Sequence, residues 1–243
     1  MSPPLRAGVG LVVPLYDEEA VAGRALARLC AGLAQTAQPW RLYAVNNGSR
    51  DGTGGVLDAF AAAHPQVQVI HLAENAGYGG GILRGLDHAR RDGWAVLGWA
   101  WGDDQIDPSV IPSLARACAG GADLAKVRRV HRFDGLQRRA ITRAYAAATR
   151  VLGARSADLN GCPKLWRAPA LARLQLRSTD WFLDPEAVLR AEALGMLITE
   201  LPCAMLPRAG GVSKVRWSTV GRFGLQLLSW QAGWRPSGTI RTG

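Results

Sequence analysis

Short apolar runs and amphipathic stretches alternate along the first half of the chain. Runs such as VGLVV at 9–13 and WAVLGWAW at 94–101 are typical of buried strands. Apolar residues spaced three or four apart, as at Val21, Ala25 and Leu29, indicate a helix. This alternation predicts an α/β fold with a doubly wound, mostly parallel sheet. The predicted strands are 9–13, 40–45, 67–72, 94–101 and 122–127, and the predicted helices are 18–37, 53–63, 80–91 and 108–118.

Polar, turn-rich segments follow three of these predicted strands. They are PLYDEE at 14–19, NNGSRDGT at 46–53 and GDDQIDP at 102–108. The carboxyl ends of parallel strands lie at one edge of a sheet, and open α/β folds bind their ligands there. We therefore expect the three segments to meet at a binding site.

The composition is that of an ordinary globular protein. A chain of 243 residues, 48% hydrophobic and 20% charged, is long enough to bury a sizeable core. Because no apolar run approaches the roughly 18 residues of a membrane-spanning helix and the first residues lack a signal-peptide core, we expect a cytoplasmic protein. The four cysteines and four histidines show no CxxC pair and no metal-ligand spacing, which favours reduced thiols and argues against zinc.

The net charge of +10 comes mainly from arginine. A solvated basic surface would explain it, but many arginines gather just after the last predicted strand. The fork of N–H groups on a guanidinium matches phosphate oxygens, and a basic cluster also suits nucleic acid or an anionic membrane. Composition alone leaves these partners open. The cluster contains Arg128, Arg129, Arg132, Arg138, Arg139 and Arg143.

Two further segments have chemistry that is ambiguous when each is taken alone. NAGYGGGILRGL at 75–86 is a glycine-rich entry to a helix, where backbone can approach an anionic ligand. It is not a dinucleotide fingerprint, because Ile82 stands where that motif needs glycine. Asp103 and Asp104 form either an exposed acidic turn or a site for Mg²⁺ or Mn²⁺ shared with a phosphate-bearing substrate. The convergence of polar loops at one edge favours the metal site.

The chain carries six segments in the order and with the spacing of one known family. They are VVPLYDEEA, NNGSRDGT, NAGYGGGILRGLDHA, WGDDQIDP, DLNGCPKLWR and LITELPCAMLPRAGGVSK, spread over residues 8–214. Together they resemble the family 2 glycosyltransferases, and within them the dolichol-phosphate mannose synthase-like branch that acts on polyprenyl phosphates. The resemblance implies the nucleotide-sugar-binding GT-A fold, in which helices flank a Rossmann-like, mostly parallel sheet.

The resemblance also implies a role for each matching position. Asp103, Asp104 and Gln105 would form the catalytic metal loop, with Asp103 and Asp104 as ligands of Mg²⁺ or Mn²⁺. The nucleotide-diphospho-sugar would contact Pro14, Tyr16, Glu18, Asn46, Asn47, Asp51, Asp103, Arg208 and Lys214. The acceptor phosphate would contact Arg129, Arg138, Thr142 and Ser213.

The nature of the acceptor decides whether a general base is needed. A lipid phosphate is already ionised, whereas a hydroxyl must lose a proton to a carboxylate within hydrogen-bond reach. The segment STDWFLDPEAVLR offers Asp180, Asp184 and Glu186, and we include Asp184 among the predicted catalytic residues. Acids in the first turn of a helix also stabilise that helix, so a structural role is the alternative.

The sequence departs from the family pattern at two places. Trp101 stands where the metal motif has its first Asp, and an indole cannot bind a metal, so metal affinity is expected to fall. Asn46 and Asn47 replace the pair of acids in the second motif; they keep hydrogen bonding but lose charge, which would alter base preference.

We expect an inverting glycosyltransferase domain at 1–214 that moves a sugar from a nucleotide-diphospho-sugar to a polyprenyl phosphate, with no nucleic acid partner. Two alternatives stay open: transfer to a soluble small-molecule hydroxyl, and an inert nucleotide-sugar-binding protein. The amphipathic tail at 215–243 carries tryptophans among arginines and no transmembrane helix. It would either lie peripherally on the inner face of the membrane or pack on the domain.

Overall fold

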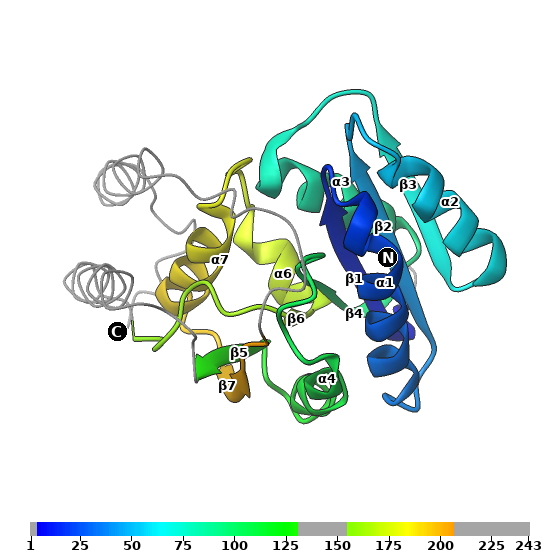
Figure 1. Cartoon of the computed structure of the whole chain (residues 1–243). Helices are drawn as coiled ribbons and strands as arrows, with labels where there is room; N and C mark the ends of the chain where they lie inside the picture. The colour runs from blue at the N-terminus through cyan, green and yellow to red at the C-terminus, as the bar shows by residue number, and fades with distance from the viewer. Residues whose placement is uncertain (1–3, 131–154, 207–243) are drawn as a thin grey trace, which may run out of the picture.

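The computed structural model describes residues 4–130 and 155–206, through which one seven-stranded sheet runs in the order β3-β2-β1-β4-β6-β5-β7 (Figure 1). The strands are β1 (Arg6–Leu15), β2 (Trp40–Asn47), β3 (Val67–Leu72), β4 (Trp94–Trp99), β5 (Leu124–Val130), β6 (Lys164–Arg167) and β7 (Ile198–Ala204). The helices are α1 (Glu19–Ala34), α2 (Thr53–Ala63), α3 (Gly77–Arg91), the 3₁₀ turn η1 (Pro108–Val110), α4 (Ile111–Ala119), α6 (Ala168–Leu174) and α7 (Leu183–Ala193).

The sheet is mostly parallel, as the alternating pattern predicts. Strands β1 to β4 run parallel, β6 runs antiparallel to both β4 and β5, and β7 runs parallel to β5. Six strands therefore end at the same edge of the sheet, which we call the carboxyl edge, and β6 begins there. The sequence did not predict β6 or β7. Strand β6 has only four residues, KLWR, too few to show a period.

Helices cover both faces of the sheet (Figure 1). In β1, Val12 packs in the core beneath α3, α6 and α7, whereas Leu11 and Val13 pack in the core beneath α1, α2 and α4. Because successive side chains of a strand point to opposite faces, a strand buried on both sides must be apolar throughout. That requirement explains the unbroken run at 9–13. In the ranges 4–130 and 155–206, no helix is long and apolar enough to cross a bilayer.

The glycine-rich segment opens α3 three residues earlier than predicted, at Gly77. A Cβ on Gly79 would lie 2.4 Å from the carbonyl oxygen of Ser178, and the Gly80 N–H donates to the Thr179 carbonyl at 2.9 Å. The sequence pattern alone suggests that these glycines leave room for an anionic ligand. In the structure they make room for residues 178–180, which brings the start of α7 to the carboxyl edge.

Gly79→Ala should lower the free energy of unfolding by about 1–3 kcal/mol, because overpacked contacts force the backbone to shift. Gly55→Ala in α2 is the matched control. No atom outside the neighbouring residues and the backbone of α2 lies within 4 Å of the added methyl. This change should therefore raise the free energy of unfolding by about 0.5–1 kcal/mol, because alanine lowers the backbone entropy of the unfolded chain. Urea unfolding of both variants measures the difference. Equal effects would contradict the close packing of α3 on residues 178–180.

Candidate active site

The loops after β1 and β2 are joined at the carboxyl edge. The Asp17 N–H donates to the Ser49 hydroxyl at 3.1 Å, and the Glu18 N–H donates to the Thr53 hydroxyl at 2.9 Å. Asp51 accepts from the Thr53 N–H at 3.0 Å. Burial acts to raise the pKa of Asp51, but the hydrogen bonds from Thr53 outweigh it and lower that pKa. These hydrogen bonds place the segment after β1 beside the loop after β2, and Pro14 lies one residue before the end of β1.

Asn47 links β2 to the start of α3. Its Nδ2 donates to the Gly77 carbonyl at 2.9 Å and to Asn75 Oδ1 at 3.2 Å, while its Oδ1 accepts from the Ala76 N–H at 3.1 Å. A carboxylate has no N–H and would lose both donated bonds. The departure from an acid at this position thus has a structural reason.

Asn46 has an orientation fixed by its neighbours. Its Oδ1 accepts from the Ser49 N–H at 3.1 Å, so its Nδ2 faces His71 Nδ1, also at 3.1 Å. His71 Nε2 lies 2.9 Å from Asp58 Oδ1. Because Asn46 can only donate to Nδ1, this geometry assigns the proton of a neutral His71 to Nε2.

The adjacent acids Asp103 and Asp104 of the GDDQIDP loop have different partners. Asp103 Oδ1 accepts from the backbone N–H of Gln105 at 3.2 Å. Asp104 has a positive φ of 57° and a side chain only 6% exposed; Arg24 lies 2.9 Å from it, and Arg28 also pairs with it. Both carboxylate oxygens of Asp104 are thus engaged by arginines, which disfavours Asp104 as a metal ligand. The carbonyl of Gln105 accepts from the Leu206 N–H at 2.7 Å, which ties the loop to the end of β7.

The described carboxylates at this edge could supply a divalent cation with only one or two ligands. The described residues contain no group of three or more His, Cys, Asp or Glu side chains arranged to hold a metal. Mg²⁺, however, commonly binds through one or two carboxylates together with substrate phosphates and waters. Asp103 is suited to that role beside a diphosphate, whereas Trp101 adds no ligand.

A buried polar chain connects the metal loop to α7. Trp101 Nε1 donates to the Tyr78 hydroxyl, and that hydroxyl donates to Asp184 Oδ2, both at 2.9 Å. Asp184 Oδ1 accepts from Lys164 Nζ at 2.6 Å and from Trp99 Nε1 at 2.9 Å. Burial, and then the nearby Asp184 charge, raise the pKa of Tyr78 well above its usual value, so its hydroxyl stays protonated and can donate.

The three candidate general bases lie in different environments. Asp184 and Glu186 are both 2% exposed. Glu186 is paired with Arg190 at 2.7 Å, and it accepts from the Ser178 N–H at 2.8 Å. Asp180 is partly exposed and accepts from the Phe182 N–H at 3.0 Å. The structure therefore gives Asp184 and Glu186 structural partners and places Asp180 nearer the surface.

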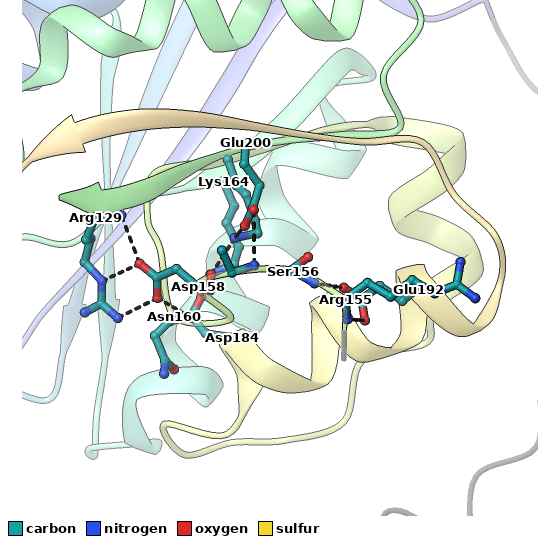
Figure 2. A network of polar contacts seen from close by, with 11 residues as sticks. Arg129, Arg155, Ser156, Asp158, Asn160, Lys164, Asp184, Glu192 and Glu200 are labelled. Carbon is teal, nitrogen blue, oxygen red and sulfur yellow. Dashed lines mark hydrogen bonds and ion pairs between the residues drawn. The ribbon is translucent and has the colours of Figure 1, made fainter. Parts of the chain in front are cut away.

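Arg129 reaches the carboxyl edge from β5. Its Nε and Nη2 each donate to Asp158 at 2.7 Å, and its guanidinium carbon lies 5.3 Å from the centroid of the Trp101 ring. Figure 2 shows the guanidinium facing the Asp158 carboxylate. Burial acts to raise the pKa of Asp158, but the hydrogen bonds from Arg129 outweigh it and hold that pKa far below its usual range. In the described part of the chain, Nη1 of Arg129 makes no hydrogen bond.

Two buried lysines lie next to this arginine, and sequence reasoning missed their role. Lys126 and Lys164 face each other across β5 and β6, and both side chains are 0% exposed. Lys126 pairs with Glu200 at 2.5 Å, and burial followed by the Lys164 charge lowers its pKa. Only three of the 29 basic residues are lysine, and two of them are buried in this cluster. In a chain that otherwise uses arginine, the rarity of lysine is the sequence signal that could have singled out Lys126 and Lys164.

Five predicted contacts of the donor or acceptor lie outside the described residues. They are Arg138, Thr142, Arg208, Ser213 and Lys214.

Comparisons with known proteins show similarity to glycosyltransferases. A model of the family described as glycosyl transferase family 2 matches residues 11–175. The polyprenol monophosphomannose synthase of Mycolicibacterium smegmatis is 28% identical over 231 residues, covering 90% of this chain and 85% of that protein. The undecaprenyl-phosphate mannosyltransferase of Micrococcus luteus is 26% identical, covering 90% of this chain and 92% of that protein. The undecaprenyl-phosphate 4-deoxy-4-formamido-L-arabinose transferase of Shewanella sediminis is 33% identical over 54% of this chain and 39% of that protein.

Solved structures share the architecture. The crystal structure of glucosyl-3-phosphoglycerate synthase from Mycobacterium tuberculosis with Mn²⁺, uridine diphosphate and glucosyl-3-phosphoglycerate superposes with a TM-score of 0.68. It is 15% identical and covers 93% of this chain and 86% of that chain, so it shows the fold, which is GT-A as predicted. Because the family model spans more than half of the sequence, the chain belongs to glycosyl transferase family 2.

Proposed function

We propose that this protein transfers a sugar, with inversion, from a nucleotide-diphospho-sugar to a polyprenyl phosphate. An oxygen of the acceptor phosphate attacks the anomeric carbon, and the bond from that carbon to the diphosphate breaks on the opposite side. The nucleoside diphosphate leaves with the bonding electrons. Several relatives are named for polyprenyl or undecaprenyl phosphate, which supports this acceptor class.

Arg129 carries the proposal for the acceptor. Asp158 binds the guanidinium along one side, and the guanidinium carbon lies over the Trp101 ring. Among the residues that the structure describes, none bonds to Nη1, which leaves that nitrogen for an anion. An arginine that is already ordered loses little entropy on binding, and its hydrogen bond to a phosphate is charge-assisted. Trp101 lies two residues before Asp103, so this cation lies next to the proposed donor site.

The environment of the carboxylates also favours a phosphate acceptor. A hydroxyl acceptor would need a general base, but Asp184 and Glu186 are buried and already accept several hydrogen bonds. A phosphate monoester brings its own negative charge and needs no base. Transfer to a soluble hydroxyl through Asp180 remains the second candidate, because that carboxylate is partly exposed.

The donor would lie across the loops after β1, β2 and β4. Tyr16, Glu18 and Asp51 would line the nucleoside pocket, and Asp103 would hold Mg²⁺ or Mn²⁺ against the diphosphate. When bound, the cation would neutralise charge on the leaving diphosphate. The chain's own part is to fix Asp103, whose loop is anchored through Gln105 and Leu206.

A polyprenyl acceptor resides in a membrane, so the domain must reach a membrane surface. We extend the proposal to two parts of the chain. Residues 1–214 form the transferase domain, and the basic, tryptophan-containing tail at 215–243 contacts that surface from the cytoplasmic side.

Asp103→Asn should reduce turnover by at least about 100-fold, because a bound cation contributes several kcal/mol to stabilising the leaving group. Its affinity for Mn²⁺ in the presence of a nucleoside diphosphate should fall as well, and calorimetry measures that loss without turnover. Asp107→Asn is the control in the same loop, since Asp107 is exposed and its side chain caps η1. A near-normal rate in Asp103→Asn would remove Asp103 from the metal site.

Arg129→Lys should raise the KM for a polyprenyl phosphate by about 10- to 100-fold while the KM for the donor hardly changes, because lysine cannot bind Asp158 and a phosphate with a fork of N–H groups. Arg128→Ala is the control, since Arg128 is exposed and its side chain leaves the other face of β5. Kinetics with a polyprenyl phosphate and with a soluble alcohol separate the two acceptors. Equal, small effects on both acceptors would favour the soluble alcohol.

Wild-type protein should release a nucleoside diphosphate from at least one UDP-, GDP- or dTDP-sugar when a polyprenyl phosphate is present. Chromatography of the nucleotides measures the release. No release from any donor, with or without acceptor, would instead support an inert nucleotide-sugar-binding protein.

A further inference from the structure

Both the ring and the polar atom of Trp101 have partners at the carboxyl edge. Its Nε1–H donates to the Tyr78 hydroxyl at 2.9 Å, and the Arg129 guanidinium lies over its ring at 5.3 Å. Tyr78 in turn donates to the buried Asp184 and stacks on Trp181, with ring centroids 4.2 Å apart. The indole is therefore held on one side by α3 and α7 and itself contacts a cation of β5.

An indole and a carboxylate would hold Arg129 in different ways. A cation–π contact is made with the face of the aromatic ring and uses no hydrogen-bond acceptor, whereas a carboxylate accepts hydrogen bonds from the guanidinium N–H groups. Asp158 already takes Nε and Nη2. A second acid at position 101 would compete for the N–H groups that a phosphate needs, but the Trp101 ring leaves them available.

The opposite end of β4 carries the same arrangement away from the site. Trp94 Nε1 donates to the Tyr43 hydroxyl at 2.7 Å, Tyr43 donates to Asp92 at 2.6 Å, and Arg6 lies 4.1 Å from the Trp94 ring. Trp94 is the first residue of β4 and so lies at the other edge of the sheet. The cluster around Trp94 lies away from the site. Substitutions in it therefore measure what such a cluster contributes to stability, apart from any role in binding.

We propose that Trp101 is a positioning residue for the acceptor phosphate. Its ring holds Arg129 with Nη1 directed toward the phosphate, and its N–H anchors the ring through Tyr78 to Asp184. This inference rests on the proposed function and adds to it. At the position where the family pattern has a metal-binding acid, this protein has a residue that serves the acceptor.

Calorimetric titration with a short, water-soluble prenyl phosphate tests the inference without turnover, in the presence of Mg²⁺ and a nucleoside diphosphate. Trp101→Leu removes the ring and should weaken binding of the prenyl phosphate by about 3- to 30-fold, the range expected for a cation–π contact. Trp101→Phe keeps a ring beneath Arg129 and should weaken binding by no more than about threefold. Affinity for the nucleoside diphosphate should stay the same in both variants.

Trp101→Asp replaces the ring with the acid found at this position in the family pattern. It should tighten Mn²⁺ binding, because it restores an acid to the metal motif, and it should weaken binding of the prenyl phosphate, because the new carboxylate takes N–H groups of Arg129. Trp94→Phe is the structural control, since it removes the matching N–H bond to Tyr43 at the far edge. It should leave both affinities unchanged, and urea unfolding of every variant separates stability from binding.

Unchanged binding of the prenyl phosphate in Trp101→Leu would overturn the inference, as would an equal loss of nucleotide affinity or an equal loss in Trp94→Phe. Absence of prenyl phosphate binding to the wild-type protein would also overturn it. If the wild-type protein binds the prenyl phosphate but transfers no sugar to it from any donor, the proposed function fails. The comparison of the variants then still decides the role of Trp101.

Discussion

The buried ion pair between Lys164 and Asp184 joins the parts of the molecule on which the site depends. Lys164 belongs to the antiparallel strand β6, Asp184 belongs to α7, and their side chains are 0% and 3% exposed. Removing one partner of such a pair leaves an uncompensated buried charge and typically costs about 3–5 kcal/mol. Asp184 also accepts from Trp99 of β4 and from Tyr78 of α3. One carboxylate thus holds two strands and two helices in a fixed relation beside the carboxyl edge.

Ion pairs with carboxylates determine which arginines of this basic chain are available to bind a ligand. Asp104 engages Arg24 and Arg28 of α1, and Asp158 takes two of the three guanidinium nitrogens of Arg129. A cation held in advance needs no reorganisation when an anion arrives, which is the basis of electrostatic preorganisation. The net charge of +10 therefore does not mean that every arginine is available.

The two departures from the family pattern have local physical reasons. Asn47 donates to backbone and side-chain oxygens of residues 75–77, which an acid could not do. Trp101 donates to Tyr78 and lies beneath Arg129. At positions 47 and 101 the family pattern has a carboxylate, whereas this chain has a side chain with an N–H group. Both N–H groups donate to α3 or to the loop before it.

The sequence by itself determined the α/β class, the mostly parallel sheet and the loops that meet at its carboxyl edge. Those features follow from local periodicity and from the directionality of parallel strands, which a single chain displays. The bounds of α2 and β3 were predicted correctly because turn residues flank both elements. Only the tertiary structure decided that Asp104 faces α1, that residues 178–180 fill the space beside Gly79, and that Lys126 and Lys164 are buried opposite each other. These contacts join residues far apart in the chain, and their energies depend on burial and direction, which no short pattern of residues encodes.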